Sequence, residues 1–308
     1  MDAHDAKNRL CSARKPTVVD QAVRLDLGIS NYNYPEKLDE CLTALRRNST
    51  TDWRCLVVDN MSTDPKVKEV LERHASEEPR IIPRYMTSNT GYVGAVNELL
   101  AWAETNNVGY LDNDAYVRTY GWDEKLASYL ESNHEVAMAF PNGGAYPIQR
   151  ARYLEILWGV GFCWILNRQR YKEIGGFDTE IGHQEEVDFQ TRIRLGGWKI
   201  VADPSVQVAH DANSTRNPDA QERINAGVVN WVNKWNKYFV GPHVTYHSPN
   251  VTRFEDWTAP YMEEWYQLQP ELNGLNDNPE TVYIAALGRE VDLIKVPRWQ
   301  NLYRGRII

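Results

Sequence analysis

Short apolar segments alternate with segments of helical periodicity from residue 24 to residue 114, and this alternation constrains the fold more than any other feature. The apolar segments are typical of buried strands, and each of the first three is followed by turn residues and then by apolar residues at helical spacing. Strands that alternate with helices in this way form a parallel sheet with right-handed crossovers. The predicted strands cover residues 24–29, 53–58, 80–85 and 108–111, and the predicted helices begin at Pro35, at Pro65 and near Val93.

The last of these strands ends in Gly109-Tyr110-Leu111-Asp112-Asn113-Asp114. In an open α/β sheet, ligands bind outside the carboxyl ends of the strands. Two carboxylates one residue apart at such an edge can face one crevice and bind Mg²⁺ or Mn²⁺. An ion held there against two phosphates would neutralise charge that develops on a leaving diphosphate. Taken alone the pattern is weak, because roughly one Asp-x-Asp occurs by chance in a chain of this length, and a solvated turn is the alternative.

Composition narrows the class of protein. The 308 residues suit one large α/β domain with an extension, or two domains, and a formal net charge of −8 argues against a surface that coats nucleic acid. Four cysteines without CxxC spacing favour a reducing compartment. The most apolar stretch, 154–166, is shorter than the roughly 20 residues that span a bilayer. With a polar start to the chain, we expect a cytoplasmic protein without a transmembrane segment.

The second half of the chain has a less regular pattern. Residues 145–160 carry no clear assignment, and Asp188 and Arg192 are spaced to pair on one face of a helix. We expect an N-terminal tail (1–22), one catalytic domain (23–240) and an aromatic-rich C-terminal extension (241–308). The predicted helices are 122–130, 168–174, 185–195 and 220–238, and the predicted strands are 136–140, 161–166, 198–201 and 206–209.

Several short motifs in a fixed order give the chain a family resemblance. They are Ile29-Ser30-Asn31-Tyr32-Asn33, Val57-Val58-Asp59-Asn60-Met61-Ser62, Asn89-Thr90-Gly91-Tyr92-Val93-Gly94-Ala95-Val96-Asn97, Leu111-Asp112-Asn113-Asp114, Gly175-Gly176-Phe177-Asp178 and Glu185-Glu186-Val187-Asp188-Phe189. Over about residues 24–212 the chain resembles glycosyltransferase family 2, inverting enzymes of the GT-A fold, and most closely its rhamnosyltransferase-like branch. The resemblance implies an α/β fold with a Rossmann-like mixed sheet flanked by helices.

The resemblance also implies a nucleotide-sugar site and a cation site. Asp114 would bind Mn²⁺ or Mg²⁺ directly, Asp112 would contact the ion or the ribose, and His210 falls where relatives often carry a further metal or diphosphate ligand. Asp59 would hydrogen-bond the base or the ribose. The nucleotide sugar would be bound by Ser30, Asn31, Tyr32, Asp59, Asn89, Gly94, Asn97, Asp112 and Asn113.

The acid pair Glu185-Glu186 would carry the catalytic base. An inverting transfer needs one carboxylate near the acceptor hydroxyl to take its proton as the new bond forms. The family pattern there is Glu-Asp with the Asp as base, so Glu186 falls on the base position and this chain departs from the pattern. Glu is one methylene longer, and Glu185 is the alternative base. Both would lie in a first helical turn, where the helix dipole favours the ionised form.

These residues predict a metal-dependent enzyme that moves one sugar from a UDP, dTDP or GDP sugar to an acceptor hydroxyl with inversion. A glycan or lipid-linked saccharide is the expected acceptor, and a hydroxylated base in DNA is a second option. A nucleotidyltransferase would need a Gly-rich triphosphate loop and a lysine near the first strand, and neither stands at 28–35. A binding module without catalysis is the non-enzymatic alternative.

Overall fold

A computed structural model describes residues 24–145, 148–182 and 185–211, and short pieces at 226–227, 230, 281–284 and 289–292. Apart from these short pieces, the predicted tail (1–22), the predicted helix 220–238 and the aromatic-rich extension (241–308) lie outside the described residues.

The first half of the chain alternates strands and helices as predicted, with boundaries that differ by a few residues. Its elements are β1 (Arg24–Asn31), α1 (Pro35–Asn48), β2 (Asp52–Asp59), α2 (Pro65–Glu77), β3 (Ile81–Tyr85), α3 (Gly91–Trp102) and β4 (Asn107–Asp112). Pro35 and Pro65 occupy the starts of α1 and α2, where a missing N–H costs nothing. The carboxylate of Asp64 caps α2 by accepting from the backbone N–H of Lys66 at 2.9 Å.

In the second half the segment without an assignment contains four short strands. The elements are β5 (Ala115–Val117), α4 (Trp122–Ser132), β6 (Val136–Pro141), β7 (Gly144–Ala145), β8 (Ile148–Gln149), β9 (Leu154–Ile156), β10 (Trp158–Gly159), β11 (Cys163–Asn167), α5 (Arg168–Ile174), α6 (Glu185–Leu195), β12 (Lys199–Asp203) and β13 (Val208–His210). Two later strands, β14 (Thr281–Ile284) and β15 (Arg289–Asp292), pair with each other.

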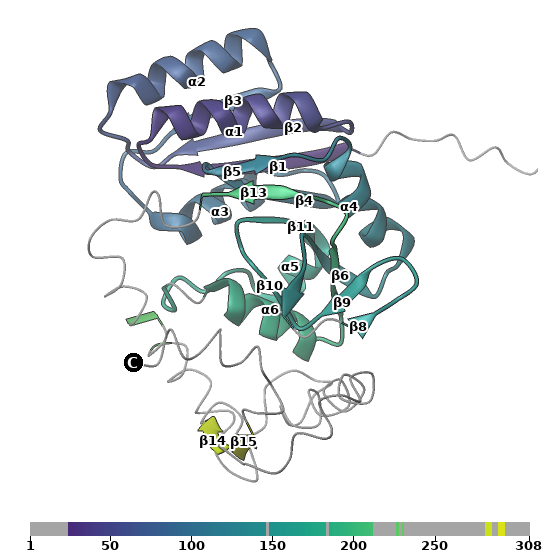
Figure 1. The fold of residues 1–308 in the computed structure, drawn as a ribbon. Helices are drawn as coiled ribbons and strands as arrows, with labels where there is room; N and C mark the ends of the chain where they lie inside the picture. Colours follow the sequence, from purple (N-terminus) through teal and green to yellow (C-terminus); the bar gives the residue numbers. More distant parts are fainter. Residues whose placement is uncertain are drawn as a thin grey trace, which may run out of the picture.

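A nine-stranded mixed sheet forms the centre, in the order β3-β2-β1-β4-β11-β6-β12-β9-β8. The strands from β3 to β4 are parallel, and β11 runs antiparallel between β4 and β6. Side chains alternate between the two faces of the sheet, so β2 contributes Cys55 and Val57 to one apolar core and Leu56 and Val58 to the other. The first core includes residues of α1, α2 and α4, and the second includes residues of α3 and α6 (Figure 1). The predicted mixed α/β sheet flanked by helices is confirmed.

The register of the parallel strands brings three predicted site segments to one edge. Asn31 at the end of β1 pairs with Asp59 at the end of β2, and Ser30 pairs with Asp112 at the end of β4. Just beyond β4, the short strand β5 pairs antiparallel with β13 and forms a separate two-stranded sheet. The carboxyl ends of β1, β2 and β4 therefore meet where the chain turns into β5.

Helix α6 is fixed by a buried ion pair that the sequence predicted. Arg192 donates to Asp188 at 2.9 Å, and both side chains are almost fully buried. Arg192 also donates to the backbone oxygen of Ile174 at 2.7 Å, which ties α6 to the end of α5. These contacts anchor α6 and therefore also hold its first turn in place.

Two further features bear on the sequence expectations. Among the described residues, no helix combines the length and the apolar character needed to cross a bilayer. Cys41, Cys55 and Cys163 are buried free thiols. Burial raises the pKa of the Cys55 thiol above its usual range, so this cysteine packs as a small apolar side chain.

Gly28 gives a test of how closely α3 packs on β1. A Cβ at this position would lie 2.3 Å from Cδ2 of Leu99 in α3, so in Gly28→Ala the buried Leu99 side chain has to shift. We expect the free energy of unfolding to fall by about 1–3 kcal/mol in urea titrations. Gly143→Ala is the matched control, because a Cβ there meets nothing within 4 Å. Equal stability of the two variants would show that Leu99 of α3 does not pack tightly against Gly28 of β1.

Candidate active site

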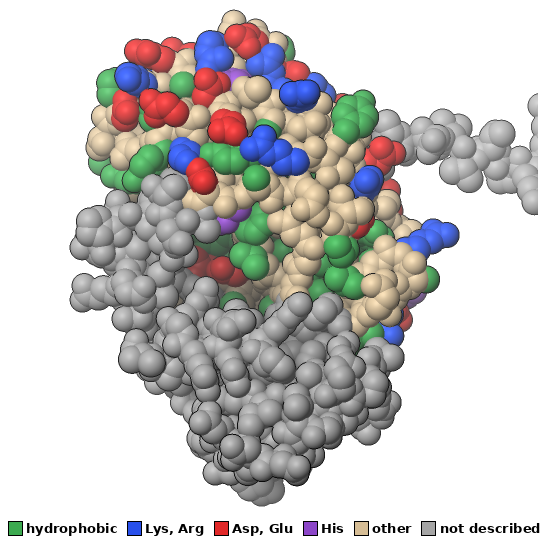
Figure 2. Space-filling view, viewed as in Figure 1, with side chains coloured by type: hydrophobic (Ala, Val, Ile, Leu, Met, Phe, Trp, Pro, Cys, Tyr) green, Lys and Arg blue, Asp and Glu red, His purple; other side chains and the backbone are tan. Residues whose placement is uncertain are grey.

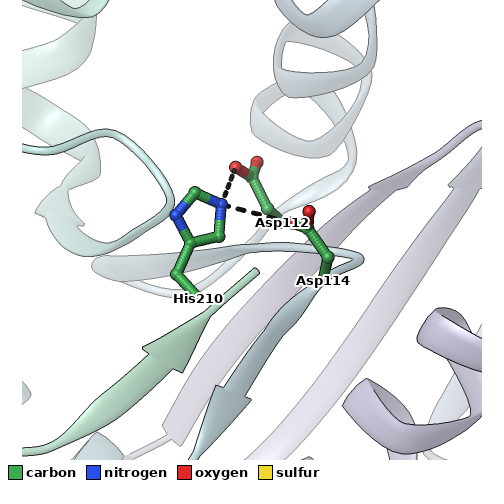
Figure 3. A group of neighbouring side chains, drawn as sticks. All are labelled: Asp112, Asp114 and His210. Carbon is green, nitrogen blue, oxygen red and sulfur yellow. Dashed lines mark ion pairs between the residues drawn. The ribbon is translucent and has the colours of Figure 1, made fainter. Parts of the chain in front are cut away.

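Two aspartates and one histidine converge beyond the carboxyl end of β4. One ligand atom from each of Asp112, Asp114 and His210 lies within 4.8 Å of the others (Figure 3). Nε2 of His210 is 3.2 Å from Oδ1 of Asp114 and 3.5 Å from Oδ2 of Asp112. Asp114 is buried, whereas Asp112 and His210 are partly exposed. The face in Figure 2 has a recess that contains histidine and acidic side chains.

Backbone pairing places these three side chains together. His210 ends β13 and is paired with Ala115, the residue after Asp114. The backbone N–H of Asp211 donates to the backbone oxygen of Asp114 at 3.1 Å. The ring of Phe162 stacks on the imidazole with centroids 4.5 Å apart, and its backbone oxygen accepts from Asp112 N–H at 2.8 Å. The cluster is thus held from β4, β5, β13 and the segment before β11.

The two carboxylates control the charge of His210. Burial lowers the pKa of this imidazole, but hydrogen bonds and attraction to Asp112 and Asp114 outweigh burial and raise the pKa to about 9. Two carboxylates and one imidazole form a mixed oxygen and nitrogen donor set that fits Mn²⁺, and a cation would replace the proton as their positive partner.

A chain of hydrogen bonds runs from this cluster to the end of β2. Asn113 donates from Nδ2 to Oδ1 of Asn31 at 2.8 Å, and Asn31 donates from Nδ2 to Oδ1 of Asp59 at 3.2 Å. The Ser62 hydroxyl also donates to this oxygen of Asp59. Asn31, Asp59 and Asn113 are all buried. Ser30 is partly buried at the end of β1, and Tyr32 is exposed just after it.

The remaining predicted nucleotide-sugar residues lie on or before α3, and each has a local structural contact. Asn89 is exposed and accepts from the backbone N–H of Gly91 at 2.9 Å. A Cβ on Gly94 would lie 2.3 Å from the Thr90 side chain, so the first turn of α3 needs glycine there. Asn97 accepts from the Tyr171 hydroxyl at 2.8 Å, which connects α3 with α5. Their roles toward a donor stay predictions.

Glu185 and Glu186 begin α6, and Glu186 reaches the same region through Gly161. A Cβ on Gly161 would lie 3.1 Å from Oε1 of Glu186. Gly161 precedes Phe162, which contacts both His210 and Asp112. Two consecutive residues therefore connect the glutamate to the aspartate and histidine cluster.

The Tyr92 hydroxyl gives a second indication that these groups are close. This hydroxyl is buried. Burial raises the pKa of Tyr92 well above its usual value, and the negative charges of Glu186 and Asp112 raise it further. One side chain from α3 is therefore close to both the acid pair and the end of β4.

The two glutamates of the pair differ in environment. Glu185 is buried, and burial raises its pKa to about 9, with repulsion from Glu186 and Asp112 adding to the effect. Glu185 is therefore neutral near pH 7. Glu186 is half-buried beside Gly161. This arrangement lets one member of the pair stay uncharged while the other carries the negative charge.

Gly161 and Phe162 were not predicted as site residues, because no sequence motif marks them. Tyr92 lies within a recognised motif, but nothing in its spacing shows that its hydroxyl is buried near acids. Only the antiparallel pairing of β11 with β4 brings the segment before β11 beside Asp112.

The environment of Glu185 predicts a pH-dependent stability difference. A carboxyl group with a raised pKa in the folded state favours folding at low pH, and this contribution is lost as pH rises toward the folded pKa. The window here runs from about 4.5 to about 9. In urea titrations we expect wild type to lose stability relative to Glu185→Gln across it, by at most about 1.4 kcal/mol per pH unit. Glu36→Gln, at an exposed position in the first turn of α1, is the control. If wild type lost stability with rising pH equally relative to Glu185→Gln and relative to Glu36→Gln, the raised pKa of Glu185 would be contradicted.

Comparisons with known proteins identify the family. The family model "Glycosyl transferase family 2" matches residues 26–181, about half of the chain. The putative teichuronic acid biosynthesis glycosyltransferase TuaG of Bacillus subtilis is 27% identical over 110 residues, covering 36% of this chain and 42% of that protein. The N-acetylglucosaminyl-diphospho-decaprenol L-rhamnosyltransferase of Mycobacterium tuberculosis is 24% identical over 234 residues, covering 60% of this chain and 75% of the relative.

A solved structure shares the fold at low sequence identity. The mannosyltransferase PcManGT from Pyrobaculum calidifontis, in complex with GDP-Man and Mn²⁺, has a TM-score of 0.60 and 16% identity, covering 93% of this chain and 82% of that one. The likeness supports the GT-A fold expected from the sequence. The family match confirms the expected family and enzyme class: the chain belongs to glycosyl transferase family 2.

Proposed function

We propose that this protein is an inverting, cation-dependent glycosyltransferase that moves one sugar from a nucleoside diphosphate sugar to an acceptor hydroxyl. The observation that carries the proposal is the placement of Glu186, through Gly161 and Phe162, beside the cluster of Asp112, Asp114 and His210. A single in-line displacement requires a base near the acceptor hydroxyl and a cation site near the departing diphosphate.

Glu186 acts as the base in the proposed reaction. The acceptor oxygen forms a bond to the anomeric carbon, the bond from that carbon to the diphosphate oxygen breaks, and the acceptor proton moves to the carboxylate. Glu185 is neutral near pH 7, since burial raises its pKa to about 9, so it is less suited to take the proton. The Phe177 and Phe189 rings stack with centroids 4.4 Å apart and pack α6 on the second apolar core.

Asp112, Asp114 and His210 would hold the cation, and Mn²⁺ suits their donor set. When bound, the ion supplies Lewis-acid stabilisation of the charge on the departing diphosphate. The carboxylate of Asp112 is oriented by the Tyr110 hydroxyl, which donates to it at 2.8 Å. Phe162 covers one face of the His210 ring and limits its rotation.

The donor is a UDP, dTDP or GDP sugar, bound along the carboxyl ends of β1 and β2 and the start of α3. Ser30, Tyr32 and Asp59 contact the nucleoside there, and Asn89, Gly94 and Asn97 lie along the sugar. The proposed acceptor is a saccharide, free or lipid-linked. The printed names of the two curated relatives, a teichuronic acid enzyme and a diphospho-decaprenol rhamnosyltransferase, support this choice.

Asp114 is the residue that tests the cation site. Asp114→Ala removes the buried carboxylate of the cluster, so we expect Mn²⁺ to bind at least tenfold more weakly and release of nucleoside diphosphate from donor to fall below detection. The assay measures turnover of UDP, dTDP and GDP sugars with Mn²⁺ or with EDTA. Asp52→Ala is the control, because Asp52 is exposed at the opposite end of β2. Full turnover by wild type in EDTA would count against a cation.

Glu186→Gln and Glu185→Gln separate the two candidate bases. Loss of a general base lowers kcat by about 10²–10⁴-fold. We expect a loss in this range for Glu186→Gln, with donor affinity retained, and a smaller loss for Glu185→Gln, whose side chain is already neutral at pH 7. Steady-state kinetics with donor and acceptor varied provide the measurement. A larger loss in Glu185→Gln would assign the base to Glu185.

A further inference from the structure

Asn31 is buried between the two halves of the proposed site. It is the last residue of β1, the strand that lies between β2 and β4 in the sheet, and its exposed fraction is 0%. Its backbone oxygen accepts from the N–H of Asn60 at 2.8 Å, which fixes the main chain. Its side chain therefore has little freedom to turn toward a ligand.

Both ends of the Asn31 amide are already used by the protein. Oδ1 accepts from Asn113 at 2.8 Å, and Nδ2 donates to Asp59 at 3.2 Å and to the Ser62 hydroxyl at 3.3 Å. An ionised carboxylate only accepts hydrogen bonds, so the NH₂ group must face Asp59 and the oxygen must face Asn113. The reverse orientation would bring two oxygens together at Asp59.

Asn113 is the residue between the two proposed cation ligands. It is 8% exposed, and its side chain is bonded to Asn31 instead of to solvent. This bond restrains the turn from Asp112 to Asp114, whose carboxylates must point the same way to face His210. Without the bond, the turn gains conformations in which the carboxylates diverge, and ordering them again on cation binding costs affinity.

We propose that Asn31 is a positioning residue. It couples Asp59, the carboxylate proposed to contact the nucleoside, to the cation-binding turn through Asn113. Asn31 and Asn113 then act through their neighbours and are not ligands of the nucleotide or the cation. The inference rests on the proposed function, because the turn it restrains carries the proposed cation ligands.

Mn²⁺ binding without nucleotide tests the coupling directly. We expect Asn31→Ala and Asn113→Ala each to bind Mn²⁺ about three- to tenfold more weakly than wild type, the range expected for loss of one buried hydrogen bond. The double variant should be about as weak as either single variant, because both remove the same bond. Titrations followed by electron paramagnetic resonance of free Mn²⁺ give the affinities, and thermal unfolding checks that each variant folds.

Asn107→Ala is the matched control. Asn107 is a buried asparagine at the opposite end of β4, and its loss should leave Mn²⁺ affinity unchanged. A metal-free measurement on wild type is independent of variant folding: the side-chain NH₂ protons of Asn113 should exchange slowly with solvent in nuclear magnetic resonance spectra. They should exchange faster in Asn31→Ala.

Four results would overturn the inference. Folded variants with wild-type Mn²⁺ affinity, or a double variant whose losses multiply, would show that Asn31 does not act through Asn113. Rapid exchange of the Asn113 amide in wild type would show that the bond is not maintained. If wild type bound no Mn²⁺, the cation site of the proposed function would fall and the coupling with it, an outcome distinct from the other three.

Discussion

The mutual repulsion of four carboxylates is the constraint on which the site depends. Asp112 and Asp114 come from one part of the chain and Glu185 and Glu186 from another, and all four side chains are at least partly withdrawn from water. Like charges at short range in a poorly solvated region are costly unless some are neutralised. His210 supplies positive charge to the aspartates, and Glu185 stays protonated.

Apolar packing surrounds this cluster, and it positions α6, the helix that begins with the acid pair. Phe177 and Phe189 stack in the second apolar core, and the buried pair of Asp188 and Arg192 lies in α6 behind the acid pair. A buried ion pair adds little stability relative to apolar residues, but breaking it exposes an uncompensated charge, so it favours a single arrangement. The glutamates therefore begin a helix whose position is well defined.

Much of the fold could be predicted because its signals are local. Apolar runs, prolines at helix starts and i, i+4 spacing depend only on neighbouring residues, and they identified β1 to β4, α1 to α3 and the pair of Asp188 and Arg192. The short strands β7 to β10 could not be predicted, because strands of two or three residues carry no periodicity and are defined by their partners. The same holds for the contacts of Gly161 and Phe162.

The sequence by itself determined the residue types of the site and their order: two aspartates at a strand end, an acid pair before an apolar helix and a histidine after a short strand. Only the tertiary structure decided which of these groups meet and what charge they carry. The pairing of β13 with β5 brings His210 to Asp114, and burial together with neighbouring charge makes Glu185 unlike Glu186. The physical reason is that distance and solvation set electrostatic energies, and both depend on segments far apart in the chain.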